Sequence, residues 1–194
     1  MLFGETREEL GGSEYLAVVH KRKAGEPPRV DLNAERALQQ LMVEAASHGL
    51  IKSAHDCSDG GLAVALAESC IVDGDHLIGA RVDVSHVAGR MSLRSDALLF
   101  GESTGRIIIS CARHHVEMLE TLAQRHGVRA VLIGKVGGAR LTIDPWIEES
   151  VDVLSDAWRS GLPKALGVQG SGLGVLAQSP EPRTPNTLKH GRLG

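Results

Sequence analysis

Aromatic residues make up only 3% of this 194-residue sequence, and no basic block interrupts a chain whose net charge is −3. Few aromatic side chains argue against a protein that binds single-stranded nucleic acid, because such proteins stack bases on aromatic rings. The slight negative charge argues against a general binder of phosphate backbones. No apolar run approaches the roughly 18 residues that a membrane span needs, and the N-terminus has no signal-peptide pattern. We therefore expect neither nucleic acid nor a membrane as a partner.

Cysteines are also scarce. Cys57, Cys70 and Cys111 are widely separated and form no Cys-x-x-Cys pair. An odd number of cysteines without the spacing of a disulfide framework indicates reduced thiols and a cytoplasmic location. The histidines are scattered, and His114 and His115 do not combine with Cys57 into a zinc-like spacing, so a structural zinc site is not expected.

Hydrophobic residues, at 42%, and charged residues, at 23%, are in the proportion of a globular protein that can bury a core. Apolar periodicity and turn residues predict strands that alternate with helices. The predicted strands are 14–20, 50–55, 77–84, 106–111, 130–136 and 140–143. The predicted helices are 32–48, 62–71, 92–100, 114–126 and a last one that begins at Pro145. This order predicts an α/β domain of the α+β type, with a mixed sheet covered by helices.

The composition changes near residue 166. Glycine and serine recur at 170–174, and three prolines follow at 180, 182 and 185. Such a segment cannot bury enough apolar surface to order itself. We therefore predict one domain over residues 1–166 and a disordered tail over 167–194.

One segment, 53–62 with the sequence SAHDCSDGGL, carries a pattern typical of a ligand site. A strand ends, polar residues follow, and Gly60 and Gly61 begin a helix. The first N–H groups of a helix have no partner within it, and together with the helix dipole they attract anions, phosphate above all. Because glycine has no Cβ, a ligand can approach the backbone closely at these two positions.

Two carboxylates in the same turn, Asp56 and Asp59, would repel a bare phosphate. They suit one if Mg²⁺ bridges the carboxylate and phosphate oxygens, and Ser58 could bond a phosphate oxygen or the water shell of the metal. A structural interpretation stands beside this one. Ser58 or Asp59 can cap the helix while the glycines allow tight packing of strand on helix. On the residues alone the structural interpretation is favoured, since the turn lacks the lysine of a Walker motif.

Four segments resemble, in the right order, the ligase subunit of phosphoribosylformylglycinamidine synthase. They are EELGGSEYL at 8–16, SAHDCSDGGLAVALAE at 53–68, LFGESTGR at 99–106 and WRSGLP at 158–163. The resemblance covers about residues 1–166. It implies the fold of an aminoimidazole-ribonucleotide-synthetase C-terminal domain, here the second such domain of the subunit.

The resemblance also implies a reaction and partners. The family converts formylglycinamide ribonucleotide, glutamine and ATP into the formylglycinamidine, with glutamate, ADP and phosphate released. Its multi-subunit form implies, as partners, the remaining domains of the ligase subunit, a separate glutaminase subunit and a small bridging subunit. The family's main ATP- and substrate-binding motifs and its catalytic histidine lie upstream of EELGGSEYL. We therefore expect no catalytic residue in this chain, and no turnover by the chain alone.

For the 53–62 segment the resemblance implies an auxiliary nucleotide, ATP or ADP, bound with Mg²⁺. Asp56, with Asp59, is then the expected metal ligand, and Ser58, with Gly60 and Gly61, the expected nucleotide contact. The turn 102–104 corresponds to a substrate-binding turn in the other half of the family. Its glutamine is replaced by Thr104, so we expect a structural turn. His55 and Cys57 are also expected to be structural.

Two other interpretations remain open. The chain could come from another enzyme of the same superfamily, such as selenophosphate synthetase, thiamine-monophosphate kinase or the hydrogenase-maturation protein, although these are not expected to contain ELGGSEYL. It could also be a non-enzymatic module that binds a nucleotide or packs against a partner. Kinship of fold alone would not distinguish these functions.

Overall fold

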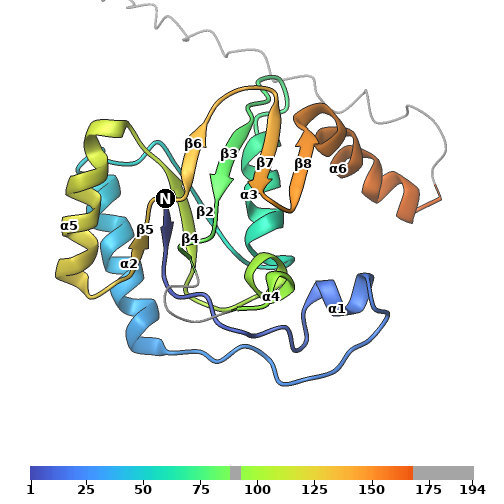
Figure 1. The fold of residues 1–194 in the computed structure, drawn as a ribbon, viewed down its shortest axis with the longest axis horizontal. Coiled ribbons are helices and arrows are strands. Elements are labelled where there is room, and N and C mark those ends of the chain that lie inside the picture. The colour runs from blue at the N-terminus through green and yellow to red at the C-terminus, as the bar shows by residue number, and fades with distance from the viewer. Residues whose placement is uncertain (88–92, 168–194) are drawn as a thin grey trace, which may run out of the picture. The chain divides into compact units, whose positions relative to one another are not determined.

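The computed structural model describes residues 1–87 and 93–167, and within them the strands form two four-stranded sheets (Figure 1). The first sheet has the order β2–β4–β1–β5, with bounds Ser53–Asp56, Ile107–Ser110, Leu2–Phe3 and Ala130–Val131. The second has the order β6–β3–β7–β8, with bounds Gly134–Val136, Ala80–Asp83, Arg140–Asp144 and Ile147–Ser150. All pairs are antiparallel except β3 with β7, so the second sheet is mixed.

The helices lie between these strands in the chain. They are α1 Glu14–Val18, α2 Leu32–Ser47, α3 Gly61–Ile71, α4 Ser95–Phe100, the 3₁₀ turn η1 Arg113–His115, α5 Val116–His126 and α6 Val151–Ala165. The predicted α+β class is confirmed, but the predicted single sheet is wrong, because the strands divide between two sheets.

The two central strands of the first sheet, β1 and β4, are buried on both faces. Alternate residues of a strand point to opposite faces, and here Leu2 and Ile108 belong to one core cluster while Phe3 and Ile109 belong to the other. The second cluster also contains buried residues of α2 and α5, which pack together on that face of the sheet (Figure 1). This double burial explains why the sequence of β4, Ile-Ile-Ile-Ser, is apolar without alternation.

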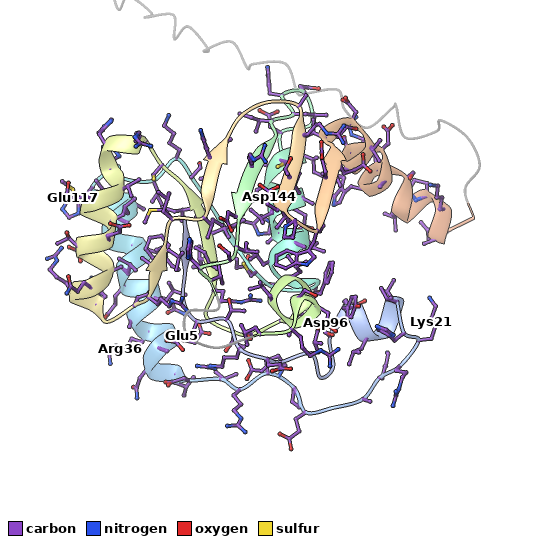
Figure 2. The ribbon with its side chains drawn as sticks, viewed as in Figure 1. Glu5, Lys21, Arg36, Asp96, Glu117 and Asp144 are labelled. Atoms are coloured by element: carbon purple, nitrogen blue, oxygen red, sulfur yellow. The ribbon has the colours of Figure 1, made fainter. Side chains whose placement is uncertain are left out.

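The second sheet is buried on one face only. In β3, Ala80 and Val82 are buried while Arg81 and Asp83 are exposed. The buried face joins α3 and α4 in the first core cluster. Helix α3 has seven buried residues among its eleven, which confirms that its nearly uniform apolar sequence makes it a central element. Charged side chains such as Glu117 lie on the outside (Figure 2).

Capping residues fix the ends of the helices that were predicted most closely. The Asp31 side chain accepts hydrogen bonds from the N–H groups of Asn33 and Ala34, at 2.9 and 3.1 Å, and so begins α2. Gly127, with φ of 67°, ends α5 in the left-handed conformation that glycine adopts most easily. The predicted helices 32–48, 62–71 and 114–126 are confirmed to within a residue or two.

The predicted strand at 14–20 is wrong, because this segment forms the short helix α1. Ser13 accepts a hydrogen bond from the N–H of Leu16 at 3.3 Å, as an N-cap does. The N–H of Glu14 donates to the carboxylate of Glu102, which lies 88 residues further along the chain. These two contacts satisfy the first turn of a helix and outweigh the strand preference of Tyr15 and Val18.

Two further predictions need correction. The predicted strand 130–136 is two strands, because β5 pairs with β1 in the first sheet and β6 pairs with β3 in the second. Pro145 does not begin the last helix. It follows a cis peptide bond in the turn between β7 and β8, and the helix begins at Val151. The strand β1 was not predicted at all, since two residues are too few for a periodic pattern.

The chain divides into a compact unit, Met1–Trp158, and a second unit that begins at Arg159. Residue Ser92, predicted as the start of a helix, and positions 168–194 of the predicted disordered tail lie outside the described residues. Among the described helices none combines the length and the apolar character needed to cross a membrane.

Candidate functional site

The predicted site turn joins β2 to α3. β2 ends at Asp56, paired with Ile107 of β4, and the N–H of Cys57 donates to the carbonyl oxygen of Arg106 at 2.9 Å. α3 then begins at Gly61. The first residues of the turn are therefore held by the neighbouring strand, and the turn presents its polar side chains from a fixed backbone.

Three of the predicted ligands are accessible to solvent. Asp56, Ser58 and Asp59 are all exposed. The hydroxyl of Ser58 donates a hydrogen bond to the carboxylate of Asp56. This hydrogen bond is the main reason that the pKa of Asp56 lies below its usual value. Asp56 is thus an ionised, accessible oxygen donor at neutral pH, as a metal ligand should be.

The two glycines are buried, and both adopt left-handed backbone conformations, with φ of 78° at Gly60 and 68° at Gly61. A Cβ on Gly61 would lie 2.5 Å from the carbonyl oxygen of Gly101, and one on Gly60 would lie 2.4 Å from the side chain of Val64. The left-handed backbone and the close packing within the chain therefore explain why both positions are glycine. The alternative that Ser58 or Asp59 caps α3 is wrong, since the N-cap is Gly60 and neither of these two side chains bonds the first turn of the helix as a cap.

The carboxylate of Glu102 reaches the start of α3. Its Oε1 atom accepts a hydrogen bond from the N–H of Gly60 at 2.8 Å and another from the N–H of Glu14 at 2.8 Å. One side chain thus occupies the anion-attracting N-termini of α1 and α3. Sequence reasoning singled out Glu102 within its motif, but it did not connect the residue with Gly60, because no local pattern reports a contact across 42 positions.

The rest of the turn 102–106 is structural, as expected. Ser103 is buried and accepts a hydrogen bond from the N–H of Arg7 at 3.2 Å. Arg106 is only 2% exposed, and its guanidinium donates to the carbonyl oxygens of Ser103 and Gly101 and to the hydroxyl of Thr6. Burial lowers the pKa of Arg106. No sequence pattern indicated that Arg106 would be buried.

His55 and Cys57 occupy structural positions. The Nδ1 atom of His55 lies 2.7 Å from the carbonyl oxygen of Asp56, and its Nε2 atom lies 3.3 Å from the carboxylate of Glu68, so the ring links β2 to α3. Burial raises the pKa of Cys57 to about 11, so its thiol is a poor nucleophile at neutral pH.

The donor set suits a metal that is shared with a ligand. No group of three or more histidine, cysteine, aspartate or glutamate side chains converges anywhere in the described residues. Mg²⁺ is commonly held by one or two carboxylates together with phosphate oxygens and water. Asp56 and Asp59 therefore fit Mg²⁺ that a nucleotide phosphate completes, and they do not form an all-protein metal cage.

Comparison with known proteins gives one consistent result. Residues 1–144 match the family described as AIR synthase related protein, C-terminal domain. A phosphoribosylformylglycinamidine synthase subunit PurL from Anaeromyxobacter sp. (strain K) is 40% identical over 178 residues, which are 91% of this chain and 24% of that protein. The chain therefore spans about a quarter of the length of this relative.

Solved structures of PurL from Thermotoga maritima share the fold of this chain. Its complex with FGAR has a TM-score of 0.67 at 21% identity, and the alignment covers 79% of this chain and 27% of that one. At the same identity and coverage of this chain, a PurLQS structure gives a TM-score of 0.60 with 25% of that chain covered, and the complex with ADP gives 0.58 with 24%.

Proposed function

Because the chain belongs to the family of AIR synthase related protein C-terminal domains, we propose that it is the C-terminal part of a phosphoribosylformylglycinamidine synthase ligase subunit. The observation that carries this proposal is the 40% identity over 91% of the chain with a protein of that name. This relative favours the synthase over selenophosphate synthetase, thiamine-monophosphate kinase or a freestanding module. In this proposal the chain contributes to de novo purine biosynthesis as one piece of a larger enzyme.

The complete enzyme is an ATP-dependent carbon–nitrogen ligase that uses glutamine as the amide donor and amidates formylglycinamide ribonucleotide. The main active site belongs to the rest of the subunit. The role of this chain is to complete the subunit and to carry an auxiliary nucleotide. The isolated chain accordingly has no turnover.

A chimera tests this assignment. The corresponding C-terminal quarter of the Anaeromyxobacter subunit is replaced by this chain, and ADP release is measured with formylglycinamide ribonucleotide, ATP and ammonium as nitrogen source. Ammonium removes the need for a glutaminase. We expect turnover by the chimera and none by the truncated subunit or by this chain alone. A folded chimera without turnover would count against the assignment.

The auxiliary nucleotide is ATP or ADP, held through Mg²⁺ at the turn 56–61. Asp56 and Asp59 supply carboxylate oxygens to the metal. Ser58 turns its hydroxyl from Asp56 to a phosphate oxygen. Gly60 and Gly61 allow the left-handed turn that places Ser58 and Asp59 beside the phosphates, while their own N–H groups stay bonded to Glu102 and to the carbonyl oxygen of Ser58. The exposure of the three polar side chains supports this proposal. Because Glu102 already accepts the N–H of Gly60, the phosphates contact the chain through the metal and Ser58 and not through this N–H group.

Calorimetric titration with ADP and Mg²⁺ tests the nucleotide site. Asp56→Asn and Ser58→Ala should both abolish binding, and leaving out Mg²⁺ should have the same effect. Asp152→Asn, an exposed aspartate in the first turn of α6, is the matched control and should bind as the unmodified chain does. No binding by the unmodified chain would leave the turn with a structural role only.

The partners in this proposal are the remaining domains of the ligase subunit, a glutaminase subunit and a small bridging subunit. The existence of a PurLQS structure for the Thermotoga maritima protein supports separate subunits. The three cysteines are free, which suits the reducing environment of the cytoplasm.

A further inference from the structure

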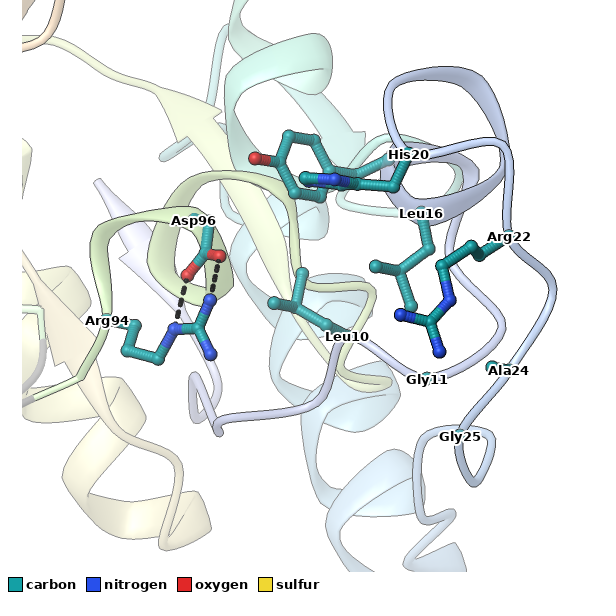
Figure 3. A pocket seen from close by; sticks show the side chains of 10 residues that line it. Leu10, Gly11, Leu16, His20, Arg22, Ala24, Gly25, Arg94 and Asp96 are labelled. Atoms are coloured by element: carbon teal, nitrogen blue, oxygen red, sulfur yellow. Dashed lines mark hydrogen bonds and ion pairs between the residues drawn. The ribbon is translucent and has the colours of Figure 1, made fainter.

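A pocket of about 400 Å³ lies between α1, the loop that follows it and the start of α4 (Figure 3). Apolar side chains of Leu10, Tyr15 and Leu16 form part of its wall. A cavity of this size can take one large side chain or a small organic molecule. No residue of the turn 56–61 lines it, so it is distinct from the proposed nucleotide site.

Backbone hydrogen bonds hold the wall of this pocket in place. The N–H of Arg22 donates to the carbonyl oxygen of Leu16 at 3.0 Å, and the N–H of Gly12 donates to that of Ala24 at 3.0 Å. A Cβ on Gly11 would lie 1.9 Å from the carbonyl oxygen of Glu26, so the two segments touch through their backbones. The pocket is therefore formed before any ligand arrives, which reduces the ordering that binding requires.

Among the residues that the structure describes, Arg22 is an unpaired cation at the rim of the pocket, and Lys21 and Lys23 flank it in the chain without lining the pocket. Lys21, Arg22 and Lys23 are consecutive and exposed, and none of them forms a salt bridge within the described residues. The guanidinium of Arg22 lines the pocket together with His20 (Figure 3). Arg94, across the pocket, is already paired with Asp96.

The combination of charge and apolar wall selects one kind of occupant. A free inorganic anion would bind the cations and leave the apolar wall exposed to water. A nucleic-acid strand would use its phosphates, but the two rings that line the pocket, Tyr15 and His20, already pack on each other, and Tyr15 is stacked on Phe100 with ring centroids 4.9 Å apart. An acidic protein segment with one apolar side chain uses both features, because its carboxylates face the cations while its side chain fills the cavity.

We propose that this pocket is a docking site for an acidic segment of a partner protein, which inserts an aliphatic or aromatic side chain between Leu10 and Leu16. Lys21, Arg22 and Lys23 attract the flanking carboxylates. The site does not depend on the nucleotide at the turn 56–61, so the two proposals can fail separately.

The probe is a fluorescently labelled synthetic peptide with one leucine flanked on each side by aspartate and glutamate, titrated against the full chain by anisotropy. A matched peptide has serine in place of leucine. Arg22→Glu reverses a rim charge, and Ala24→Leu narrows the cavity from a position that is exposed. Arg36→Glu is the control, because Arg36 is an exposed arginine on α2, well away from Lys21 (Figure 2). Circular dichroism checks that each variant is folded.

The leucine peptide should bind at least about tenfold more tightly than the serine peptide, and more weakly as salt is added. Arg22→Glu and Ala24→Leu should each lower its affinity about fivefold or more, while Arg36→Glu should change it less than about twofold. Equal binding of the two peptides, or equal loss in Arg22→Glu and Arg36→Glu, would overturn the proposal. So would full competition by a single-stranded oligonucleotide, or loss of peptide binding when the chain is part of the complete ligase subunit.

Discussion

The Oε1 atom of Glu102 lies 2.8 Å from the backbone nitrogen of Gly60 and accepts its hydrogen bond. The same atom accepts the N–H of Glu14. One carboxylate therefore joins the beginning of α1 to the beginning of α3, and it supplies from within the chain the negative charge that helix N-termini attract. This contact gives the 99–106 motif a structural role that does not require a substrate.

Removing this carboxylate should destabilise the fold. Glu102→Ala leaves two backbone N–H groups without their charged acceptor, and we expect a loss of about 1–3 kcal/mol in the free energy of unfolding. Glu102→Gln keeps an acceptor oxygen and should lose less. Urea denaturation measures both, with Glu120→Ala as the control, an exposed glutamate on α5. Equal stability of Glu102→Ala and the control would contradict the proposed link between the helices.

Substitution of Gly61 should destabilise the fold more than substitution of a glycine that has no close contact. Gly61→Ala places a Cβ 2.5 Å from a backbone oxygen at φ of 68°, whereas at Gly49, with φ of 65°, no atom lies within 4 Å of the added Cβ. Gly49→Ala should cost about 1 kcal/mol from backbone conformation alone. Gly61→Ala should cost about 2–4 kcal/mol, because the clash is added. Similar unfolding midpoints in urea for the two variants would show that the chain relaxes around Gly61.

Acid should weaken a contact between α2 and α5. His126 and Arg125 bond the carboxylate of Glu44 at 2.7 and 2.8 Å, and the hydrogen bond with His126 is the main reason that the pKa of Glu44 is lowered. A carboxyl whose pKa is lower in the folded chain stabilises it above the unfolded-state pKa of about 4.3, and this stabilisation is lost as the pH falls through the folded-state value.

The difference in stability between the unmodified chain and Glu44→Gln should therefore be present at pH 7 and should shrink below about pH 4. Urea midpoints at a series of pH values measure it. Glu120→Gln, at an exposed position of α5, provides the comparison, for which we expect little change with pH. If the difference in stability between the unmodified chain and Glu44→Gln grew in acid, the ionised carboxylate of Glu44 would not be what stabilises the fold.

The cysteines should differ in reactivity. Burial raises the pKa of Cys57 and of Cys70 to about 11, so at pH 8 only about one thiol in a thousand is ionised. Cys111 is partly exposed. Iodoacetamide at pH 8 should therefore modify Cys111 first, and the other two should react only after urea unfolds the chain. Peptide mass spectrometry identifies the modified residue, and early labelling of Cys57 would contradict its burial.

Local patterns were enough to predict the elements that local physics determines. The Asp31 cap and the apolar period fixed α2, and the uniform apolar character of 62–71 identified α3 as central. The segment 14–20 was predicted wrongly because Glu102, the residue that completes the first turn of α1, lies 88 positions away. The division of 130–136 between two sheets likewise depends on partners that are distant in the sequence.

At the candidate site, too, the sequence predicted the local features and not the contacts with distant residues. The order of a strand, two aspartates, a serine and two glycines predicted a polar turn at the start of a buried helix, and the exposed residues Asp56 and Ser58 lie there. The sequence could not show that Glu102 would bond the N–H of Gly60, nor that the space beside Gly61 would be filled by Gly101. Contacts between turns depend on the packing of the whole domain.

The short passage from β5 to β6 limits how this chain can change in evolution. Only Leu132 and Ile133 separate two strands that belong to different sheets, and the carbonyl oxygen of Ile133 accepts the N–H of Asp83 at 2.7 Å. One inserted residue here would turn the side chains of a strand to the opposite face of its sheet. Insertions and deletions should therefore accumulate in exposed loops such as 72–76, while the spacing between β5 and β6 is inherited unchanged.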